Sequence, residues 1–209
     1  MSSLESIPEA LFDCLVIIEE LERTLQGVSR LEVQKLAFLA CLLSLYKGQP
    51  ASEWGYHFSR TPFGTPFSRE INSAFDYLST SGRIVISNKS RAKLTLTGAS
   101  LIQQLKFLDN CKQRLTYLKC AATSLLVVPP GTLMRGLENE PTTSASETRA
   151  VGATLLEGPA VHLLYEDFAS LSSVFTDPAD LLTPSVVWLT CLADEPLSQS
   201  NPSGAHQHA

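Results

Sequence analysis

Few side chains in this sequence have the types and spacing that catalysis requires. The chain contains no GxSxG nucleophile motif, no GxxxxGK[ST] phosphate-binding loop and no HExxH zinc-binding motif. Cys41 and His57 are a conceivable nucleophile and base, but Cys41 lies in the most apolar stretch of the chain, which disfavours a thiolate. His162 and Glu166 have the i, i+4 spacing of metal ligands, although solvated pairs with this spacing are far commoner. We therefore expect no enzymatic activity, no metal site and no cofactor.

The charge of the chain is divided unevenly along its length. Between Arg60 and Lys119, ten lysines and arginines stand against three carboxylates. From Val127 to the end, two arginines stand against ten carboxylates, and the whole chain has a net charge of −5. This asymmetry indicates either internal docking of the two halves or an acidic partner for the basic half.

The best-placed cations lie in and beside a predicted β-hairpin. Lys89, Arg91 and Lys93 follow one another closely, and Arg83 precedes them. These side chains suit contact with a phosphate backbone that does not depend on base sequence. Two other interpretations stay open: docking to an acidic protein surface, and an ordinary solvated hairpin whose lysines protect an edge strand from aggregation.

The helix predicted before this hairpin is a weaker nucleic-acid surface. Its outer face carries Arg69 and Asn72 as candidate contacts, but Glu70 and Asp76 lie on or near the same face. A winged helix that reads bases presents several Arg, Lys, Asn or Gln side chains there. Because carboxylates repel a polyanion, this face is poorly suited to duplex DNA.

Three aromatic residues are candidates for contact with a protein partner. Trp54 and Phe63 belong to an aromatic group around a loop, which either seals the core or, if exposed, forms a hot spot for a partner. Trp188 belongs to a C-terminal apolar helix that packs either on the first helix or on another chain.

The elements that must position these residues are centred on the stretch from Thr61 to Leu96. Apolar residues after Pro66 have helical spacing, and Ser81-Gly82 ends the helix. A β-branched run at 84–86, a polar turn at 87–90 and an alternating pattern through 94–96 then predict a hairpin. A helix followed by a tight turn and a hairpin is the outline of a winged helix.

Two helices precede this unit. The first is predicted over residues 8–26, with Pro8 at its first position. Ser29 and Glu32 form a capping box that begins a second helix, which continues to about Tyr46. Residues 36–46 are apolar on nearly every side, so this helix is expected to form the core.

The rest of the chain divides by composition. We expect a winged-helix domain over residues 1–126, including a helix from about Gly98 that Thr97 caps. A linker or mobile loop is expected over 127–154, a C-terminal helical extension over 155–195, and a disordered tail with His206 and His208 over 196–209. The predicted fold class is mainly α with a small β-hairpin: a winged-helix core with N-terminal helices and a C-terminal helical extension.

The chain lacks signals for a membrane or for secretion. No run approaches the roughly 20 apolar residues of a membrane span, and the start of the sequence has no basic segment followed by an apolar one. The five cysteines form no C-x-x-C pair and mostly lie in apolar helical patterns. We expect a cytoplasmic protein.

Several motifs between Arg30 and Leu105 resemble a known family. The segment 31–36, LEVQKL, is similar to the "LQKLLYLA" opening of the Panacea (SocA-like) domain, and TPFGTP at 61–66 resembles its "YGP" segment. FDYL at 75–78 and LTG at 96–98 look like the "ALDYL…LTxxG" ending. The same order of motifs resembles the middle component of bacterial ABC-three-component systems, which include Lamassu.

This resemblance implies a non-catalytic adaptor. The resemblance implies that the chain belongs to an anti-phage or anti-plasmid defence complex, together with an SMC/Rad50-like ABC ATPase and an effector protein from the same operon. The alternative is a winged-helix DNA-binding regulator or antitoxin, in which non-specific DNA contact runs through the hairpin cations.

Overall fold

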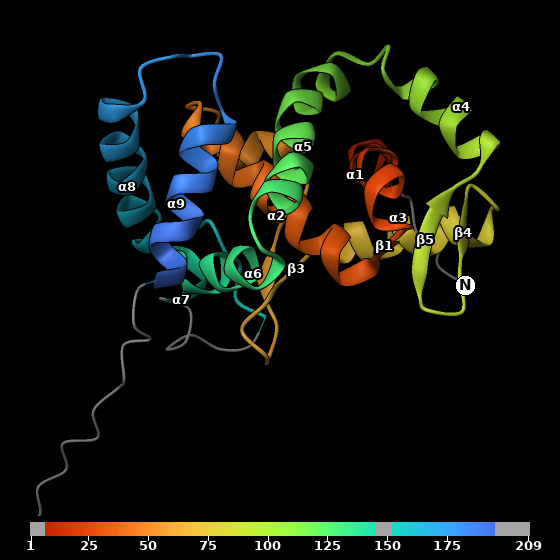
Figure 1. Ribbon diagram of the computed structural model, residues 1–209, viewed down its shortest axis with the longest axis horizontal. Coiled ribbons are helices and arrows are strands. Elements are labelled where there is room, and N and C mark those ends of the chain that lie inside the picture. The colour runs from red at the N-terminus through yellow and green to blue at the C-terminus, as the bar shows by residue number, and fades with distance from the viewer. Residues whose placement is uncertain (1–6, 145–151, 195–209) are drawn as a thin grey trace, which may run out of the picture.

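A computed structural model describes residues 7–144 and 152–194, which are mainly helical with two small antiparallel sheets (Figure 1). The helices are α1 Pro8–Leu25, α2 Arg30–Tyr46, α3 Arg69–Thr80, α4 Leu96–Leu105, α5 Asp109–Val127, α6 Pro130–Asn139, α7 Pro141–Ser144, α8 Ala160–Val174 and α9 Leu182–Asp194, with a 3-10 turn at Ala51–Trp54. The strands are β1 Val28–Ser29, β2 Ser59–Arg60, β3 Pro66–Phe67, β4 Ile84–Ile86 and β5 Arg91–Leu94. The predicted fold class, mainly α with a small hairpin, is confirmed.

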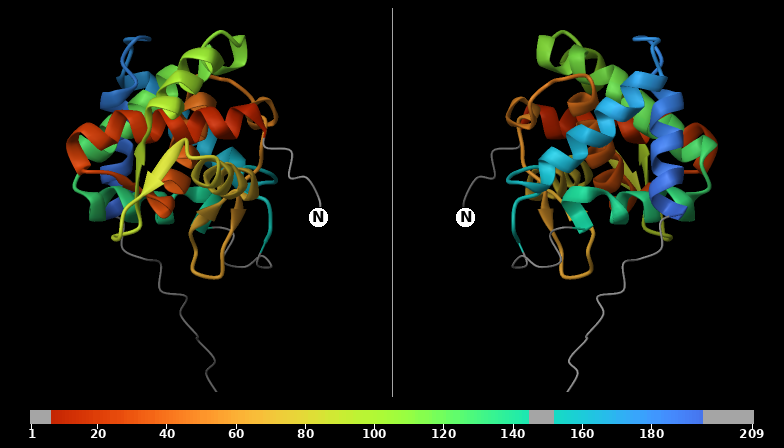
Figure 2. Two further views of the ribbon diagram at one scale, coloured as in Figure 1. Left: turned by 90° about the vertical axis from the view of Figure 1, so that its right-hand side faces the viewer. Right: turned by 90° about the vertical axis from the view of Figure 1, so that its left-hand side faces the viewer.

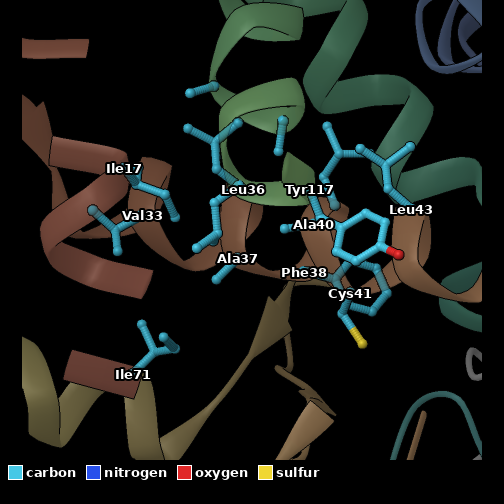
Figure 3. Close-up of a cluster of buried hydrophobic side chains, with 14 of the residues drawn as sticks. Ile17, Val33, Leu36, Ala37, Phe38, Ala40, Cys41, Leu43, Ile71 and Tyr117 are labelled. Carbon is cyan, nitrogen blue, oxygen red and sulfur yellow. The ribbon is translucent and has the colours of Figure 1, made fainter. Parts of the chain in front are cut away.

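Helix α2 is the centre of the core, as its apolar sequence predicts. The capping box is formed: the Glu32 backbone N–H donates to Ser29 Oγ at 3.2 Å, and the Ser29 N–H donates to the Glu32 carboxylate at 2.6 Å. Nearly every residue from Val33 to Leu45 is buried. Figure 3 shows Ile17 of α1 and Tyr117 of α5 among the side chains that surround α2.

The helix and hairpin predicted between Thr61 and Leu96 form as α3 and the β4–β5 hairpin. Helix α3 begins after Ser68, whose side chain accepts a bond from the Ile71 N–H, and Gly82 follows its end with a φ of +69°. Strands β4 and β5 are antiparallel neighbours, and β1 pairs with β5 on its other side, which gives the strand order β1-β5-β4. The inward residues Val28 and Ala92 are opposite one another in this sheet and are buried.

A second hairpin lies between α2 and α3. Strands β2 and β3 are antiparallel, with Ser59 opposite Phe67 and Arg60 opposite Pro66. Both views of Figure 2 show this hairpin projecting from the helical body. A distant segment joins it: the Arg60 N–H donates to the Ala153 carbonyl oxygen at 3.2 Å, and the Leu155 N–H donates to Phe58 at 2.8 Å.

The prediction of a linker over 127–154 is wrong for residues 130–144, which form α6 and α7. Leu133 and Leu137 of α6 are one turn apart and buried. Gly136 permits a close approach of α6 to α9, since a Cβ there would lie 2.5 Å from the Leu189 carbonyl oxygen. Residues 145–151 of the predicted linker and the predicted tail at 196–209, with His206 and His208, lie outside the described residues.

Helices α8 and α9 occur where the C-terminal extension is predicted: α9 packs mainly on α6 and α5, α8 packs on α7, and both touch the C-terminal end of α2. The Phe168 ring lies 5.5 Å from Tyr46 and 5.2 Å from Trp188, measured between ring centroids. Such edge-to-face aromatic contacts stabilise beyond simple burial. The extension therefore shares the core of the N-terminal helices. Within the described ranges, no helix combines the length and the apolar character that a membrane span needs.

Candidate interaction site

The β4–β5 hairpin holds three of the predicted binding residues on a tight turn. The Ser87 N–H donates to the Arg91 carbonyl oxygen at 2.9 Å, and the Ser90 N–H donates to the Ser87 carbonyl oxygen at 2.9 Å. Lys89 therefore lies at the tip of the turn. Lys93 is opposite Val85 on the outer face of the sheet, and both side chains are exposed.

Arg91 has a structural role that its sequence neighbours do not reveal. Its Nε donates to the Gly27 carbonyl oxygen at 2.9 Å, and an Nη lies 3.2 Å from the Glu32 carboxylate. Gly27 allows this close contact, because its φ is +117° and a Cβ would lie 3.0 Å from the Ala92 carbonyl oxygen. Arg91 thus fixes the hairpin to the α1–α2 corner, a structural role beside which its predicted part in ligand contact stays a prediction.

The hairpin and the helices beside it enclose a groove of about 650 Å³, which we name the β4–β5 groove. It is lined by Leu25, Gln26, Glu32, Ser87, Asn88, Lys89, Arg91, Lys93, Leu125 and Pro130. Glu32 is paired with Arg91, whereas neither Lys89 nor Lys93 forms an ion pair with any described residue. The groove therefore presents uncompensated positive charge beside apolar side chains.

Residues of α3 lie outside this groove and are largely occupied within the chain. Arg30 donates to Asn72 Oδ1 at 2.8 Å and pairs with Asp76, and its guanidinium lies 4.8 Å from the centroid of the Phe75 ring. Asn72 in turn donates to Asp76 at 3.3 Å. The amide of Asn72 is therefore committed to an internal network, while Arg69 on the same helix is exposed.

Arg83 also lies apart from the groove. Its guanidinium is 5.3 Å from the centroid of the Tyr77 ring and 3.5 Å from the Tyr77 hydroxyl. Such stacking holds the cation against α3. The six predicted contact residues therefore separate into groove residues, Lys89, Arg91 and Lys93, and residues on or against α3, Arg69, Asn72 and Arg83.

The aromatic candidates have different outcomes. Trp54 and Trp188 are 3% and 4% exposed, so their prediction as partner contacts is wrong. Trp54 seals the core, and the Trp188 indole N–H lies 3.3 Å from the Asp167 carboxylate. Phe63 is 90% exposed at the tip of the β2–β3 hairpin. The Thr61 and Thr65 hydroxyls, 2.7 Å apart, close the loop that carries it.

Sequence reasoning missed a buried ionic network. Arg114 of α5 donates from Nε to Asp13 of α1 at 2.8 Å, its terminal nitrogen makes a second contact to the same carboxylate, and the Tyr56 hydroxyl donates to it as well. Arg114 also lies 3.6 Å from the centroid of the Trp54 ring. Asp13 and Arg114 each lie within an otherwise apolar face of their helix. A charged residue in such a position was the sequence feature that could have predicted a buried ion pair.

The electrostatics of this network follow from its burial. Burial raises the pKa of Tyr56, and the Asp13 carboxylate raises it further. Burial alone lowers the pKa of Arg114, but the adjacent Asp13 carboxylate outweighs that effect and raises it overall. The network therefore contains a buried ion pair between Asp13 and Arg114, which ties α1 to α5 beneath the loop that carries Tyr56.

Cys41 and His57 do line one pocket, of about 260 Å³, together with apolar residues such as Phe58 and Leu155. Cys41 is buried, and burial raises the pKa of its thiol well above the ordinary value. The exposed His57 ring lies 3.9 Å from Glu157. In the described part of the chain no hydrogen bond joins the thiol to the imidazole, and burial disfavours the thiolate form of Cys41.

The described residues also contain no group of three or more His, Cys, Asp or Glu side chains arranged to hold a metal ion. His162 and Glu166 of α8 thus lack a third ligand of these types among residues 7–144 and 152–194. Comparisons of this chain with protein-family models, with curated proteins and with solved structures gave no match.

Proposed function

We propose that this chain is a non-catalytic adaptor that docks onto another protein. Its expected setting is a bacterial defence complex against phage or plasmids, in which it is the small accessory subunit beside an SMC/Rad50-like ABC ATPase and an effector. The resemblance of residues 30–105 to Panacea-like middle components motivates this setting, and such a complex would act in the cytoplasm. The order of helix, strand, helix, short β2–β3 hairpin, helix and β4–β5 hairpin through residues 8–94 supports a winged-helix interpretation of the unit, with the β2–β3 hairpin as an insertion between its second and third helices.

One observation carries the choice of protein docking over base reading: Asn72 and Asp76 of α3 are bound to one another and to Arg30 of α2. Arg30, Asn72 and Asp76 form a closed network on the outer face of the helix. Reading a base edge with Asn72 would require this network to break and would bring Asp76 against the polyanion. A protein surface can dock beside α3 without breaking this network.

Phe63 supplies a second argument for a protein partner. When an aromatic side chain lies at the tip of a closed loop, binding it costs little further backbone conformational freedom. Aromatic anchors of this kind contribute strongly to protein interfaces. The Thr61 N–H donates to the Thr65 carbonyl oxygen at 3.0 Å, and the Gly64 N–H donates back to Thr61 at 3.0 Å, so the loop is preformed.

Co-expression with the products of the neighbouring genes tests this function. We expect the wild-type chain to elute with the coiled-coil ATPase in size-exclusion chromatography, and Phe63→Ala to weaken the complex at least about fivefold. Val174→Ala is the matched control, because Val174 is another exposed apolar residue but lies at the end of α8. A wild-type chain that elutes alone in the presence of all neighbouring gene products would refute the adaptor function.

A DNA-binding regulator or antitoxin is the second candidate, because Lys89 and Lys93 are exposed and have no ionic partner among the described residues. It predicts duplex binding at low salt that is lost when Lys89, Arg91 and Lys93 are replaced by Glu, with an affinity that falls steeply as salt rises. The absence of duplex binding by the wild type at low salt would eliminate this candidate.

A further inference from the structure

We propose that the β4–β5 groove binds an acidic polypeptide segment of the partner protein, with an apolar side chain of that segment seated against the helical wall. This inference rests on the proposed adaptor function and names the chemistry of the partner. It is carried by three features of the groove: its charge, its apolar wall and its preformed shape.

The charge of the groove is positive after internal pairing is counted. Glu32 and Arg91 neutralise one another at 3.2 Å, which leaves Lys89 and Lys93 as the charges that face a ligand. Both lysines belong to a chain whose net charge is −5 and whose second half is strongly acidic. A local positive site on an acidic protein attracts an anionic segment to one place and steers it there.

The opposite wall of the groove is apolar. Leu25 at the end of α1, Leu125 near the end of α5 and Pro130 at the start of α6 line it. Leu125 is only 4% exposed, so Leu25 and Pro130 offer most of the accessible apolar surface of this wall, and the exposed Leu126 and Val127 of α5 lie outside the groove lining. A nucleic-acid backbone has no group that fits such a wall, whereas an acidic peptide with a leucine or aromatic residue does. The apolar wall therefore favours a polypeptide over DNA.

The groove is formed before any ligand arrives. Arg91 holds the hairpin to the Gly27 carbonyl oxygen at 2.9 Å, and the Leu94 N–H donates to the Glu22 carboxylate of α1 at 2.6 Å. These bonds fix β5 against α1 on both sides of Lys93. A preformed groove loses little conformational entropy on binding, which favours a short linear segment as its ligand.

Fluorescence anisotropy with a synthetic probe tests the groove directly. The probe is a labelled peptide of about 18 residues in which Glu and Leu occupy opposite faces of a helix. Three comparison probes replace Glu by Lys, replace Leu by Ser, or substitute a mixed-sequence DNA duplex of about 20 base pairs. We expect saturable binding of the Glu/Leu peptide and at least about tenfold weaker binding of each comparison probe.

The variants locate the binding. Lys89→Glu/Lys93→Glu should weaken binding of the Glu/Leu peptide at least about tenfold, because it reverses the two unpaired charges. Lys112→Glu/Lys119→Glu makes the same change in net charge on α5, where both lysines pair with carboxylates of this chain, and should alter affinity less than about twofold. Lack of saturable binding, equal effects of the two variants, or tighter binding of the duplex than of the peptide would overturn the inference.

The same pair of variants separates this inference from the proposed function. If the wild-type chain forms a complex with the ATPase and Lys89→Glu/Lys93→Glu forms it equally well, the groove assignment fails while the adaptor function stands. If the wild type forms no complex with any neighbouring gene product, the adaptor function fails whatever the peptide result.

Discussion

Removing the buried carboxylate of Asp13 is predicted to be among the most damaging single changes in this protein. In Asp13→Leu, the Arg114 guanidinium stays in the core without its counter-ion, and the Tyr56 hydroxyl loses its acceptor. The two charged side chains are 0% and 5% exposed, so water does not compensate the loss. Breaking a buried ion pair from one side costs about 3–5 kcal/mol. That is a large part of the roughly 5–15 kcal/mol by which domains of this size are stable.

The double variant Asp13→Leu/Arg114→Met sharpens the prediction. It removes both charges, which leaves the Tyr56 hydroxyl and the Trp54 carbonyl oxygen as the unpaired groups, at about 1–2 kcal/mol each. The double variant should therefore be no less stable than Asp13→Leu alone. The two single changes should show a coupling free energy of at least about 2 kcal/mol.

Urea unfolding followed by circular dichroism measures these free energies. Asp13→Asn serves where Asp13→Leu does not fold, because the amide oxygen still accepts a bond from Arg114 while the charge is lost. We expect its stability to lie between that of the wild type and that of Asp13→Leu. Additive single effects, or a loss below about 1 kcal/mol in Asp13→Leu, would refute the picture of a dry ion pair that depends on both partners.

Three further predictions concern packing, pH and capping. Gly136→Ala should destabilise by about 1–3 kcal/mol, because its Cβ would lie 2.5 Å from the Leu189 carbonyl oxygen. Gly131→Ala in the same helix is the control, because its Cβ would meet nothing within 4 Å, and it should be neutral or stabilising by up to about 1 kcal/mol. Equal urea unfolding midpoints for the two variants would contradict the close packing of α6 on α9. Burial raises the pKa of Glu140, so the native state keeps the proton on this carboxyl to higher pH than the unfolded state does. The stability of the wild type should therefore fall as pH rises from the ordinary glutamate pKa towards the raised value. Glu140→Gln should flatten this part of the stability–pH curve, and an unchanged slope would exclude Glu140 as its source. Ser29→Ala should cost about 1 kcal/mol through loss of the α2 cap, and thermal unfolding with no shift would contradict that role.

The helices with strong periodic patterns could be predicted from sequence. The apolar run at 36–46 indicates a buried helix without any tertiary information, and the capping box marks its start. Helix α6 was missed because Pro129-Pro130-Gly131 reads as a chain break. In the structure, Pro130 instead occupies the first helical position, where its missing N–H costs nothing, and Leu133 and Leu137 then face the core.

The candidate site could be predicted only in part. The hairpin lysines could be predicted from their position in and beside a polar turn. Their apolar counterparts Leu125 and Pro130 are more than 30 residues away in sequence, so no local pattern places them beside Lys93. The internal pairing of Arg91 likewise depends on the distant Gly27 and on Glu32. Local spacing identified charged side chains, but tertiary contacts decided which of them are free to bind.

Hydrogen–deuterium exchange of the chain, alone and with the SMC/Rad50-like ATPase that we propose as its partner, is the sharpest test of docking through the two proposed segments. We expect slower exchange on complex formation in the β4–β5 hairpin and in the loop that carries Phe63. Exchange that stays unchanged in both segments while the ATPase is bound, or protection of the same hairpin by duplex DNA and not by the ATPase, would contradict it.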